Sequence, residues 1–390
     1  MGTGYRPEFS LKAEIVKEMF TLSVEGRADG ILEQDGHITV DEIKGVYRSL
    51  DAMEEPDLLH LAQAKCYAAI YGSEQKLGVI SVQMTYCNLE TEEIRRFVQE
   101  FSVEELKSWF DDLTEEYCKW CEMQVRWKKC RQKSIHTCEF PFSYREGQKQ
   151  LAAAVYRTLA NRKKLFIQAP TGVGKTISTV FPAVRAVGEN LGEKIFYLTA
   201  KTVTRTVAEE AFSVLKGKGL RYKVLTLTAK EKICPLEEAK CNPIECPYAK
   251  GHYDRVNRAV FEMLNETEVF DREAIWKRSE KWKVCPYEMT LDLSMWVDAV
   301  ICDYNYVFDP NARLKRFFGD NIKGDYLFLI DEAHNLVERG REMYSASLCK
   351  ERFLEIRRLL KSKSRKIGRT LEKCNRVLLE WKRECEDYQI

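Results

Sequence analysis

The segment at residues 164–176, KLFIQAPTGVGKT, combines residue types that can hold a phosphate chain. Its apolar run, Leu165–Ile167, predicts a buried strand, which a glycine-containing loop and then a helix follow. Glycines at such a turn let backbone N–H groups surround an anion at the positive end of the helix. We expect Lys175 to reach the β- and γ-phosphates and the Thr176 hydroxyl to bind Mg²⁺. The predicted loop comprises Ala169, Pro170, Thr171, Gly172, Val173, Gly174, Lys175 and Thr176, with Ala169 where the strict pattern has glycine.

Two acidic residues follow another apolar run, at residues 326–330. Beside a phosphate loop, Asp331 would hold Mg²⁺ through water, and Glu332 would polarise the water that attacks the γ-phosphate. The alternative is a strand that ends in solvated acids. The two motifs together predict that the chain binds ATP or GTP.

Further apolar runs predict strands at 194–202, 222–227, 297–302 and 326–330, separated by helical segments. Alternation of this kind predicts a parallel sheet with ligands at the carboxyl ends of its strands. The last part, residues 350–390, is predicted to be helical and is the most basic stretch of the chain.

Four cysteines lie between the strands predicted at 222–227 and 297–302: Cys234, Cys241, Cys246 and Cys285. Three of them directly precede a proline, in contexts that resemble loops. Four thiolates in this arrangement suit one [4Fe–4S] cluster. A structural zinc ion is the alternative, although the spacing is looser than in a zinc ribbon. Free buried thiols are not expected in so polar a segment.

A different constellation precedes residue 70. Residues 8–20 are predicted to be helical, and residues 22–32 and 38–44 to be two strands joined by a turn at 33–36. An acid on the first strand and the Glu-x-Lys of the second could hold a divalent cation, with the lysine beside an attacking water. A predicted helix at 60–68 adds a Gln and a Tyr on one face. The residues concerned are Asp29, Glu42, Lys44, Gln63 and Tyr67.

Residues 104–133 predict a helix in which three tryptophans alternate with arginines and lysines. A solvated basic face is one interpretation, and contact with a DNA backbone is the other. The stretch also holds cysteines that we expect to be free thiols, because one continuous helix cannot bring them together: Cys118, Cys121, Cys130 and Cys138.

Composition sets the broad class. The 390 residues carry a net charge of +2 and are 45% hydrophobic, as in globular proteins of two or three domains. No apolar run is long enough to span a membrane and no signal-peptide pattern is present, so a cytoplasmic protein with reduced cysteines is expected.

Two family resemblances follow from these motifs. The set Asp29, Glu42-x-Lys44 and Gln63-x-x-x-Tyr67 resembles the RecB-type branch of the PD-(D/E)XK nucleases, which implies an α/β nuclease-like fold and a Mg²⁺ or Mn²⁺ site. In that family an acid on the first helix completes the site, here Glu14 or Glu18. Whether this site is active is left open.

The phosphate loop with Asp331-Glu332-Ala333-His334 resembles the DEAH-type superfamily 2 helicases, and the cysteines narrow this to the XPD-like iron–sulfur helicases of the DinG type. The resemblance implies a RecA-like motor of DNA repair or related metabolism that moves 5′ to 3′ on single-stranded DNA. It also implies roles for further residues: Tyr144, Arg145 and Gln148 on the adenine side, Thr199, Lys201 and Thr202 on the DNA backbone, His334 in catalysis, and Asn305-Tyr306 after the insert.

The expected organisation is a nuclease-like domain at 1–138, a RecA-like domain at 139–345 with the Fe–S insert at about 230–295, and an incomplete arch-like helical insert at 346–390. No second motor domain is apparent, so we expect the amino-terminal half of a longer enzyme, able to bind ATP but not to unwind DNA processively. A metal-dependent nuclease with a nucleotide-binding tether, or an ATP-gated clamp on single-stranded DNA without turnover, are the alternatives. The oligomeric state is left open.

Overall fold

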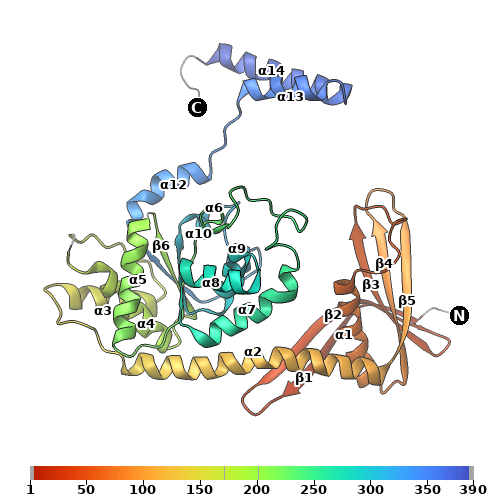
Figure 1. Cartoon of the computed structure of the whole chain (residues 1–390), viewed down its shortest axis with the longest axis horizontal. Helices are drawn as coiled ribbons and strands as arrows, with labels where there is room; N and C mark the ends of the chain where they lie inside the picture. The colour runs from red at the N-terminus through yellow and green to blue at the C-terminus, as the bar shows by residue number, and fades with distance from the viewer. Residues whose placement is uncertain (1–3, 171, 201, 386–390) are drawn as a thin grey trace.

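The computed structural model describes residues 4–170, 172–200 and 202–385, without the side chains of residues 202 and 203. Two five-stranded sheets form the centres of two parts of the chain, and one long helix runs along both (Figure 1).

The first sheet has the strand order β1-β2-β3-β4-β5. Neighbouring strands are antiparallel except β3 and β4, which are parallel because α1 crosses over between them. The predicted turn is present, with Asp35 at φ +52° and Gly36 at φ +80°. The elements are β1 (Gly4–Val16), β2 (Thr21–Gln34), β3 (His37–Val46), α1 (Leu58–Glu74), β4 (Val79–Asn88) and β5 (Ile94–Ser102).

The helix predicted at residues 8–20 is wrong, because this segment forms β1 and pairs with β2 along most of its length. Leu11 and Ile15 are four apart, which suits a helix. With Phe9 and Ala13 they also recur at every second residue, which suits a strand. All four pack into the core of the first part, so the period of two is the one that the fold uses.

Helix α2 (Val103–Thr137) joins the two parts (Figure 1). It begins where Ser102 accepts a hydrogen bond from the N–H of Glu105, and it extends the helix predicted at 104–133. Leu106 belongs to the core of the first part, whereas Ile135 belongs to a core of the second. The helix is therefore a structural member of both.

The second sheet is entirely parallel, in the order β10-β6-β9-β7-β8, with buried hydrophobic clusters against it. The four predicted strands are confirmed, and β8 was not predicted. The elements are α3 (Gln148–Ala160), α4 (Lys175–Gly188), β6 (Lys194–Thr199), α5 (Thr202–Gly217), β7 (Val224–Thr226), α6 (Lys230–Ile233), α7 (His252–Glu266), β8 (Val269–Phe270), α8 (Arg272–Trp282), α9 (Pro286–Trp296), β9 (Ala299–Asp303), α10 (Asn305–Phe308), α11 (Lys315–Phe318) and β10 (Tyr326–Ile330).

The buried strand predicted at Leu165–Ile167 is wrong. These residues belong to no helix or strand, and Phe166 is 90% exposed. They pair with neither edge strand of the second sheet, β10 or β8. An apolar run gives a segment the tendency to be buried, but it does not provide the edge with which the segment must pair.

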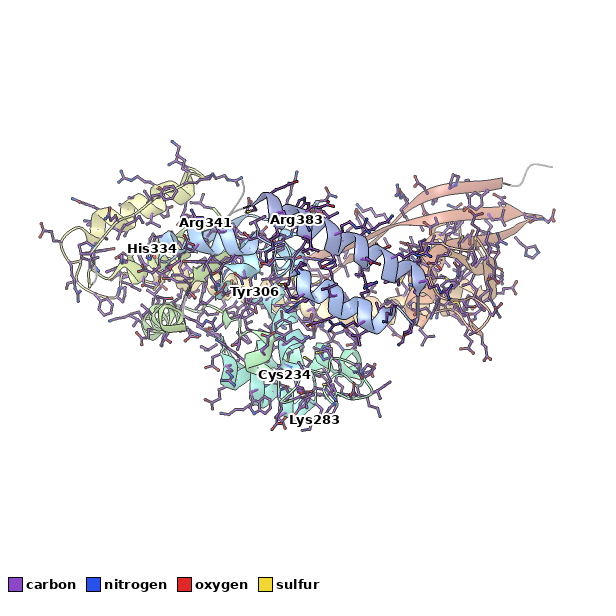
Figure 2. The ribbon with its side chains drawn as sticks, turned by 90° about the horizontal axis from the view of Figure 1, so that it is seen from above. Cys234, Lys283, Tyr306, His334, Arg341 and Arg383 are labelled. Carbon is purple, nitrogen blue, oxygen red and sulfur yellow. The ribbon has the colours of Figure 1, made fainter. Side chains whose placement is uncertain are left out.

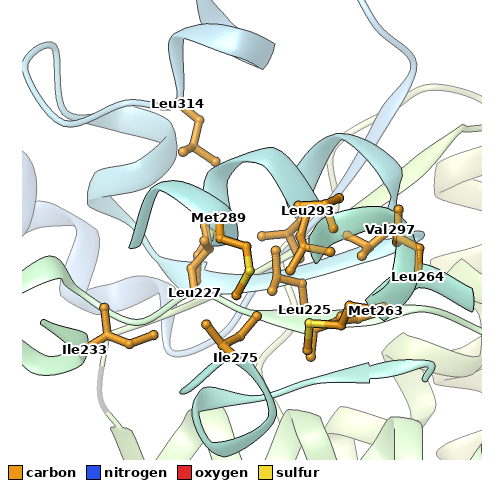
Figure 3. Close-up of a cluster of buried hydrophobic side chains, with 14 of the residues drawn as sticks. Leu225, Leu227, Ile233, Met263, Leu264, Ile275, Met289, Leu293, Val297 and Leu314 are labelled. Carbon is orange, nitrogen blue, oxygen red and sulfur yellow. The ribbon is translucent and has the colours of Figure 1, made fainter. Parts of the chain in front are cut away.

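The cysteine-containing segment between β7 and β9 is far less polar in structure than its sequence suggested. Its helices project to one side of the second part, with Cys234 and Lys283 among them (Figure 2). Their inner faces supply Ile233, Met263 and Leu293 to the same hydrophobic cluster as Leu225 of the sheet (Figure 3). The insert is therefore packed against the sheet.

Helices follow β10, as predicted for residues 350–390 as far as Cys385, where the described residues end. A 3₁₀ turn, η1 (Ala333–Asn335), leads into α12 (Leu336–Met343), and α13 (Lys350–Leu360) and α14 (Arg365–Glu384) then pack as a pair away from the sheets (Figure 1). None of the helices in the described part of the chain is long and apolar enough to cross a membrane.

Candidate nucleotide, metal and nucleic-acid sites

The phosphate loop has the backbone geometry that an anion site requires. Gly172 lies at φ +84° and Gly174 at φ +74°, values that side chains rarely allow, and α4 begins directly at Lys175. A Cβ at Gly174 would lie 2.5 Å from the side-chain nitrogen of Gln148. The loop therefore places the amino end of α4 where a phosphate can approach it. Thr171 lies outside the described residues.

Two residues predicted to bind adenine bind the loop itself. The guanidinium of Arg145 donates to the carbonyl of Gly172, and Nε2 of Gln148 donates to the carbonyl of Val173 at 2.7 Å. The Gln148 Oε1 accepts from the Arg145 N–H at 2.8 Å, so the two residues brace each other. Sequence reasoning did not predict this support of the loop. Tyr144 stacks on Phe140 with 4.1 Å between ring centroids.

Lys175 donates from Nζ to the carbonyl of Ala169 at 3.2 Å, so its ammonium already lies across the loop. Asp331 follows β10, and its N–H donates to Leu198 of the neighbouring strand at 2.9 Å. Burial and then the charge of Glu332 raise the pKa of Asp331, while Lys175 acts in the opposite sense. A carboxyl in this situation favours a cation, because a cation stabilises its ionised form.

Tyr197 connects the two motifs and was missed from the sequence. It is buried on β6, where its hydroxyl interacts with Thr176 and with Asp331. Burial, and then the charge of Asp331, raise the pKa of Tyr197, so the hydroxyl stays protonated. The only hint in the sequence was a side chain that carries a hydroxyl group within an otherwise apolar predicted strand. It could not be recognised without knowing that β6 lies beside β10.

The rest of the DEAH segment lies at the surface. Glu332 is at φ +50°, and its carbonyl accepts from the Tyr304 hydroxyl at 3.1 Å. His334 Nδ1 lies 3.4 Å from Glu332 Oε2, and both side chains are exposed. Beyond the insert, Asn305 begins α10, with its Oδ1 buried and without a hydrogen-bond partner, and Tyr306 is next along the helix.

The predicted DNA contacts are only partly placed. Thr199 is 1% exposed, so its side chain cannot reach a DNA backbone in this structure, which corrects that prediction. Thr199 is the last residue of β6, an inner strand of the sheet that is buried along its whole length. Lys201 and the side chain of Thr202 lie outside the described residues.

The four cysteines lie at loops and helix ends, as predicted, but they do not converge. Cys246 is buried. Burial raises the pKa of Cys285, and the charge of Cys246 acts in the same direction. Interaction with the Cys241 side chain raises the pKa of Lys230. Among the described residues, no group of three or more His, Cys, Asp or Glu side chains could hold a metal ion.

The donor chemistry of this segment nevertheless suits a thiolate-bound cluster. His252, which is 4% exposed, accepts the Cys285 N–H at Nδ1 with 3.1 Å between the nitrogens, so in its neutral form the proton is on Nε2. That Nε2 is buried and has no hydrogen-bond partner. An unsatisfied N–H donor among cysteines fits a sulfur acceptor, whereas the positions of the thiols do not yet form a site.

The nuclease-like residues do come together. Lys44 Nζ lies 2.7 Å from Oε1 of Glu42 and 3.1 Å from Oε1 of Gln63, whose Nε2 donates to the Tyr67 hydroxyl at 3.0 Å. Oδ2 of Asp29 accepts a hydrogen bond at 2.7 Å from the N–H of Ile43, the residue after Glu42. Strands β2 and β3 and helix α1 supply these side chains.

Glu42 is the most constrained of this group. Its side chain is 3% exposed, and Oε2 is buried without a partner. Burial raises the pKa of Glu42; Lys44 lowers it and the charge of Asp29 raises it. Glu14 and Glu18 do not complete the site as suggested, because β1 replaces the predicted helix and pairs Glu14 with Ser23, well along the hairpin from Asp29.

Residues 145–244 match the family model described as DEAD/DEAH box helicase, and residues 219–353 match the model DEAD_2. This part of the chain therefore carries DEAD/DEAH-box helicase domains, which confirms the resemblance at the level of that class. Neither match reaches the first 144 residues, so the nuclease-like interpretation stays a prediction.

Particular relatives have similar sequences over part of the chain. It is 24% identical over 263 residues to "Regulator of telomere elongation helicase 1" of Bos taurus, an alignment that covers 54% of this chain and 21% of that protein. It is 34% identical over 104 residues to "Fanconi anemia group J protein homolog" of Gallus gallus, covering 26% of this chain and 8% of that protein. The chain thus spans at most about a fifth of the length of these relatives.

Two solved structures match part of the chain at low similarity. "XPD_Helicase" covers 61% of this chain and 41% of its own at 22% identity, with a TM-score of 0.43. "Truncated XPD" covers 60% of this chain and 65% of its own at 21% identity, with a TM-score of 0.42.

Proposed function

We propose that residues 139–345 are the ATP-binding motor domain of an iron–sulfur DNA helicase of the XPD-like, DinG-type branch, which moves 5′ to 3′ on single-stranded DNA. The observation that carries the proposal is the arrangement of the phosphate loop and Asp331 around the buried hydroxyl of Tyr197, at the carboxyl ends of the parallel strands. The helicase matches over residues 145–353 support it.

The residues would act as follows. Lys175 exchanges the carbonyl of Ala169 for the β- and γ-phosphates, and the amino end of α4 binds the same charge. Thr176 and Asp331 would hold Mg²⁺, which supplies charge neutralisation at the phosphates when bound. Glu332 would orient the attacking water. Together these residues would bind ATP with Mg²⁺ at the carboxyl ends of β6 and β10.

The test compares Lys175→Ala with Glu332→Gln in titrations of a fluorescent ATP analogue with Mg²⁺. Lys175→Ala should weaken binding at least tenfold, whereas Glu332→Gln should bind like wild type. Lys164→Ala, an exposed lysine beside the same loop, is the matched control. Equal affinity of Lys175→Ala and Lys164→Ala would contradict the assignment.

We propose that Cys234, Cys241, Cys246 and Cys285 would hold a [4Fe–4S] cluster, which would tie the loops of the insert together. The buried, unpartnered Nε2 of His252 supports a sulfur-rich site there. Anaerobically purified protein should be brown and contain iron and sulfide. Cys246→Ser should lose both, and Cys349→Ser, at an exposed thiol, should keep them. Colourless protein with zinc would replace the cluster with a zinc site.

A metal-dependent DNA nuclease is the second candidate function, for residues 1–138. It is favoured by Glu42, whose buried Oε2 lacks a partner while Lys44 and Asp29 adjoin it. Cleavage of DNA with Mn²⁺ or Mg²⁺ should be abolished by Lys44→Ala and unaffected by Lys175→Ala. Cleavage that persists in Lys44→Ala would exclude this candidate.

A further inference from the structure

Charge is divided along α2. Its first 22 residues, 103–124, contain seven acids and two lysines, whereas residues 125–137 contain five arginines and lysines and no acid. Cations are favoured near the carboxyl end of a helix, but that effect is confined to the last turn. The five cations lie within residues 126–133, about two turns that end before the last turn of the helix, so the helix dipole alone does not account for them.

Most of these cations face solvent without a partner. Arg131 is buried against Asp298, with 2.6 Å between Nη1 and Oδ1. The other four are exposed, and none of them forms an ion pair with any residue that the structure describes: Arg126, Lys128, Lys129 and Lys133. Their charge is therefore available to a ligand.

Hollows lie on both sides of this half of the helix. One, of about 500 Å³, is lined by Arg126 and Trp127 together with cations from the second part, among them Lys216, Arg221 and Lys223. The other, of about 550 Å³, is lined by residues that include Lys128, Lys129 and His136. Positive charge thus continues from the exposed face into both hollows.

Acids in and around the first hollow are already engaged. Oδ2 of Asp298 accepts from the Trp127 indole and from the Lys223 N–H, and Glu268 pairs with Lys216 and Arg221. The Nζ of Lys223, a residue 3% exposed, lies 3.9 Å from the centroid of the Trp127 ring and forms no ion pair among the described residues. Burial lowers the pKa of Lys223 to about 8, and the charges of Asp298 and Glu268 act in the opposite sense, so an anion entering the hollow would favour the charged ammonium.

The surface lies away from the nucleotide site. Arg221 and Lys223 immediately precede β7, and Glu268 precedes β8, so the first hollow adjoins the amino ends of the parallel strands. The phosphate loop and Asp331 adjoin the carboxyl ends. ATP and a ligand of α2 therefore occupy opposite ends of the sheet.

We propose that residues 125–137 of α2, with the two flanking hollows, form a second nucleic-acid binding surface that holds the phosphate backbone of a single strand. The proposal rests on the proposed function in nucleic-acid metabolism. Arg126, Lys129 and Lys133 recur along one face over a rise of about 10 Å, which suits successive phosphates better than one small anion. Because Lys223 covers a face of Trp127, the surface offers charge rather than base stacking, so binding is independent of sequence.

The placement gives this surface a role between the two parts. Helix α2 continues from the basic run towards the sheet that carries Asp29 and Glu42 (Figure 1). A single-stranded nucleic acid bound along α2 would therefore lie between the motor part and the nuclease-like cluster.

The test measures the affinity of the full chain for a labelled single-stranded DNA between 50 and 200 mM salt. The variant Arg126→Glu/Lys129→Glu/Lys133→Glu should bind at least tenfold more weakly at the lower salt. The slope of log affinity against log salt should fall by about 2, since each phosphate contact on a single strand contributes about 0.7. The control Lys107→Glu/Lys119→Glu/Lys164→Glu carries the same change in net charge at exposed sites and should keep the wild-type slope.

An unchanged slope in the triple variant, or an equal loss in the control, would overturn the surface while leaving the proposed function standing. Wild type that fails to bind any single strand would overturn both. Binding of a fluorescent ATP analogue shows whether each variant is folded. A variant that is not folded is replaced by one with glutamine at the same three positions. A last experiment uses Lys175→Ala, in which the phosphate loop is impaired. If equimolar inorganic triphosphate displaces the DNA from this variant, the surface is a site for a small anion and not for a nucleic-acid backbone.

Discussion

Replacing Asp298 should detach α2 from the second part of the chain. This carboxylate is 3% exposed and binds three groups: Nη1 of Arg131 at 2.6 Å, the Trp127 indole N–H at 2.9 Å and the Lys223 N–H at 2.8 Å. In Asp298→Ala the guanidinium of Arg131, whose side chain is 11% exposed, stays buried without its counter-charge. Breaking one partner of such a pair costs about 3–5 kcal/mol, so the free energy of unfolding should fall by about that amount.

Urea unfolding followed by tryptophan fluorescence measures this change. The control is Asp320→Ala, which removes the partner of Arg313 at a side chain that is 93% exposed, and it should cost less than about 1 kcal/mol. Arg131→Met/Asp298→Leu, which removes both charges, should recover part of the loss, because the Trp127 and Lys223 N–H groups stay without their acceptor. If Asp298→Ala costs no more than Asp320→Ala, the buried pair does not hold the helix and the reasoning fails.

Three further predictions concern the two sites. Tyr197→Phe should weaken ATP binding in Mg²⁺ about three- to tenfold and leave Mg²⁺-free binding unchanged, because the lost hydroxyl interacts with Asp331. Glu42→Gln should have a higher Tm than wild type at pH 7 and the same Tm at pH 4. Burial raises the pKa of Glu42 in the folded state, so the wild type loses stability as the pH rises from about 4 through that pKa. Gly174→Ala should weaken ATP binding at least fivefold, since φ +74° costs a side chain about 1–2 kcal/mol and the Cβ would meet Gln148.

Each of these has an outcome that contradicts it. Equal losses for Tyr197→Phe with and without Mg²⁺ would mean that the hydroxyl does not act through the cation. A Tm difference between Glu42→Gln and wild type that is the same at both pH values would mean that the carboxyl is not perturbed. Wild-type ATP affinity in Gly174→Ala would mean that the backbone conformation of Gly174 is not required for binding; Gly36→Ala, at a glycine of similar φ in the first part of the chain, is the control and should leave ATP binding intact.

Some elements could be predicted because their signals are local. The apolar run at 326–330 precedes Asp331, and its length and composition indicate a strand of a parallel sheet; as the edge strand of that sheet, β10 leaves Phe328 and Ile330 exposed. The Asp35-Gly36 turn requires positive φ at two positions, which those residue types tolerate, and this fixed the β2–β3 pairing. The phosphate loop was likewise recognisable from a local pattern, its glycines together with Lys175 and Thr176.

Other elements were ambiguous in the sequence. Leu11 and Ile15 fit a helix and a strand equally well, and the choice depended on β2 offering an edge. Leu165–Ile167 looked like a strand, yet the structure gives it no partner. A local pattern records which residues tend to be buried, whereas pairing depends on what the rest of the chain brings alongside.

The sequence by itself indicated the DEAD/DEAH-box helicase class and the residues that we propose bind phosphate and Mg²⁺, because the pattern of a phosphate loop is encoded within eight consecutive residues. Only the tertiary structure decided which distant groups meet. It placed Tyr197 between the two motifs, assigned Arg145 and Gln148 to the support of the loop, and left the cations of α2 unpaired while burying Arg131. These outcomes depend on contacts between residues up to 171 positions apart, and no local pattern carries that information.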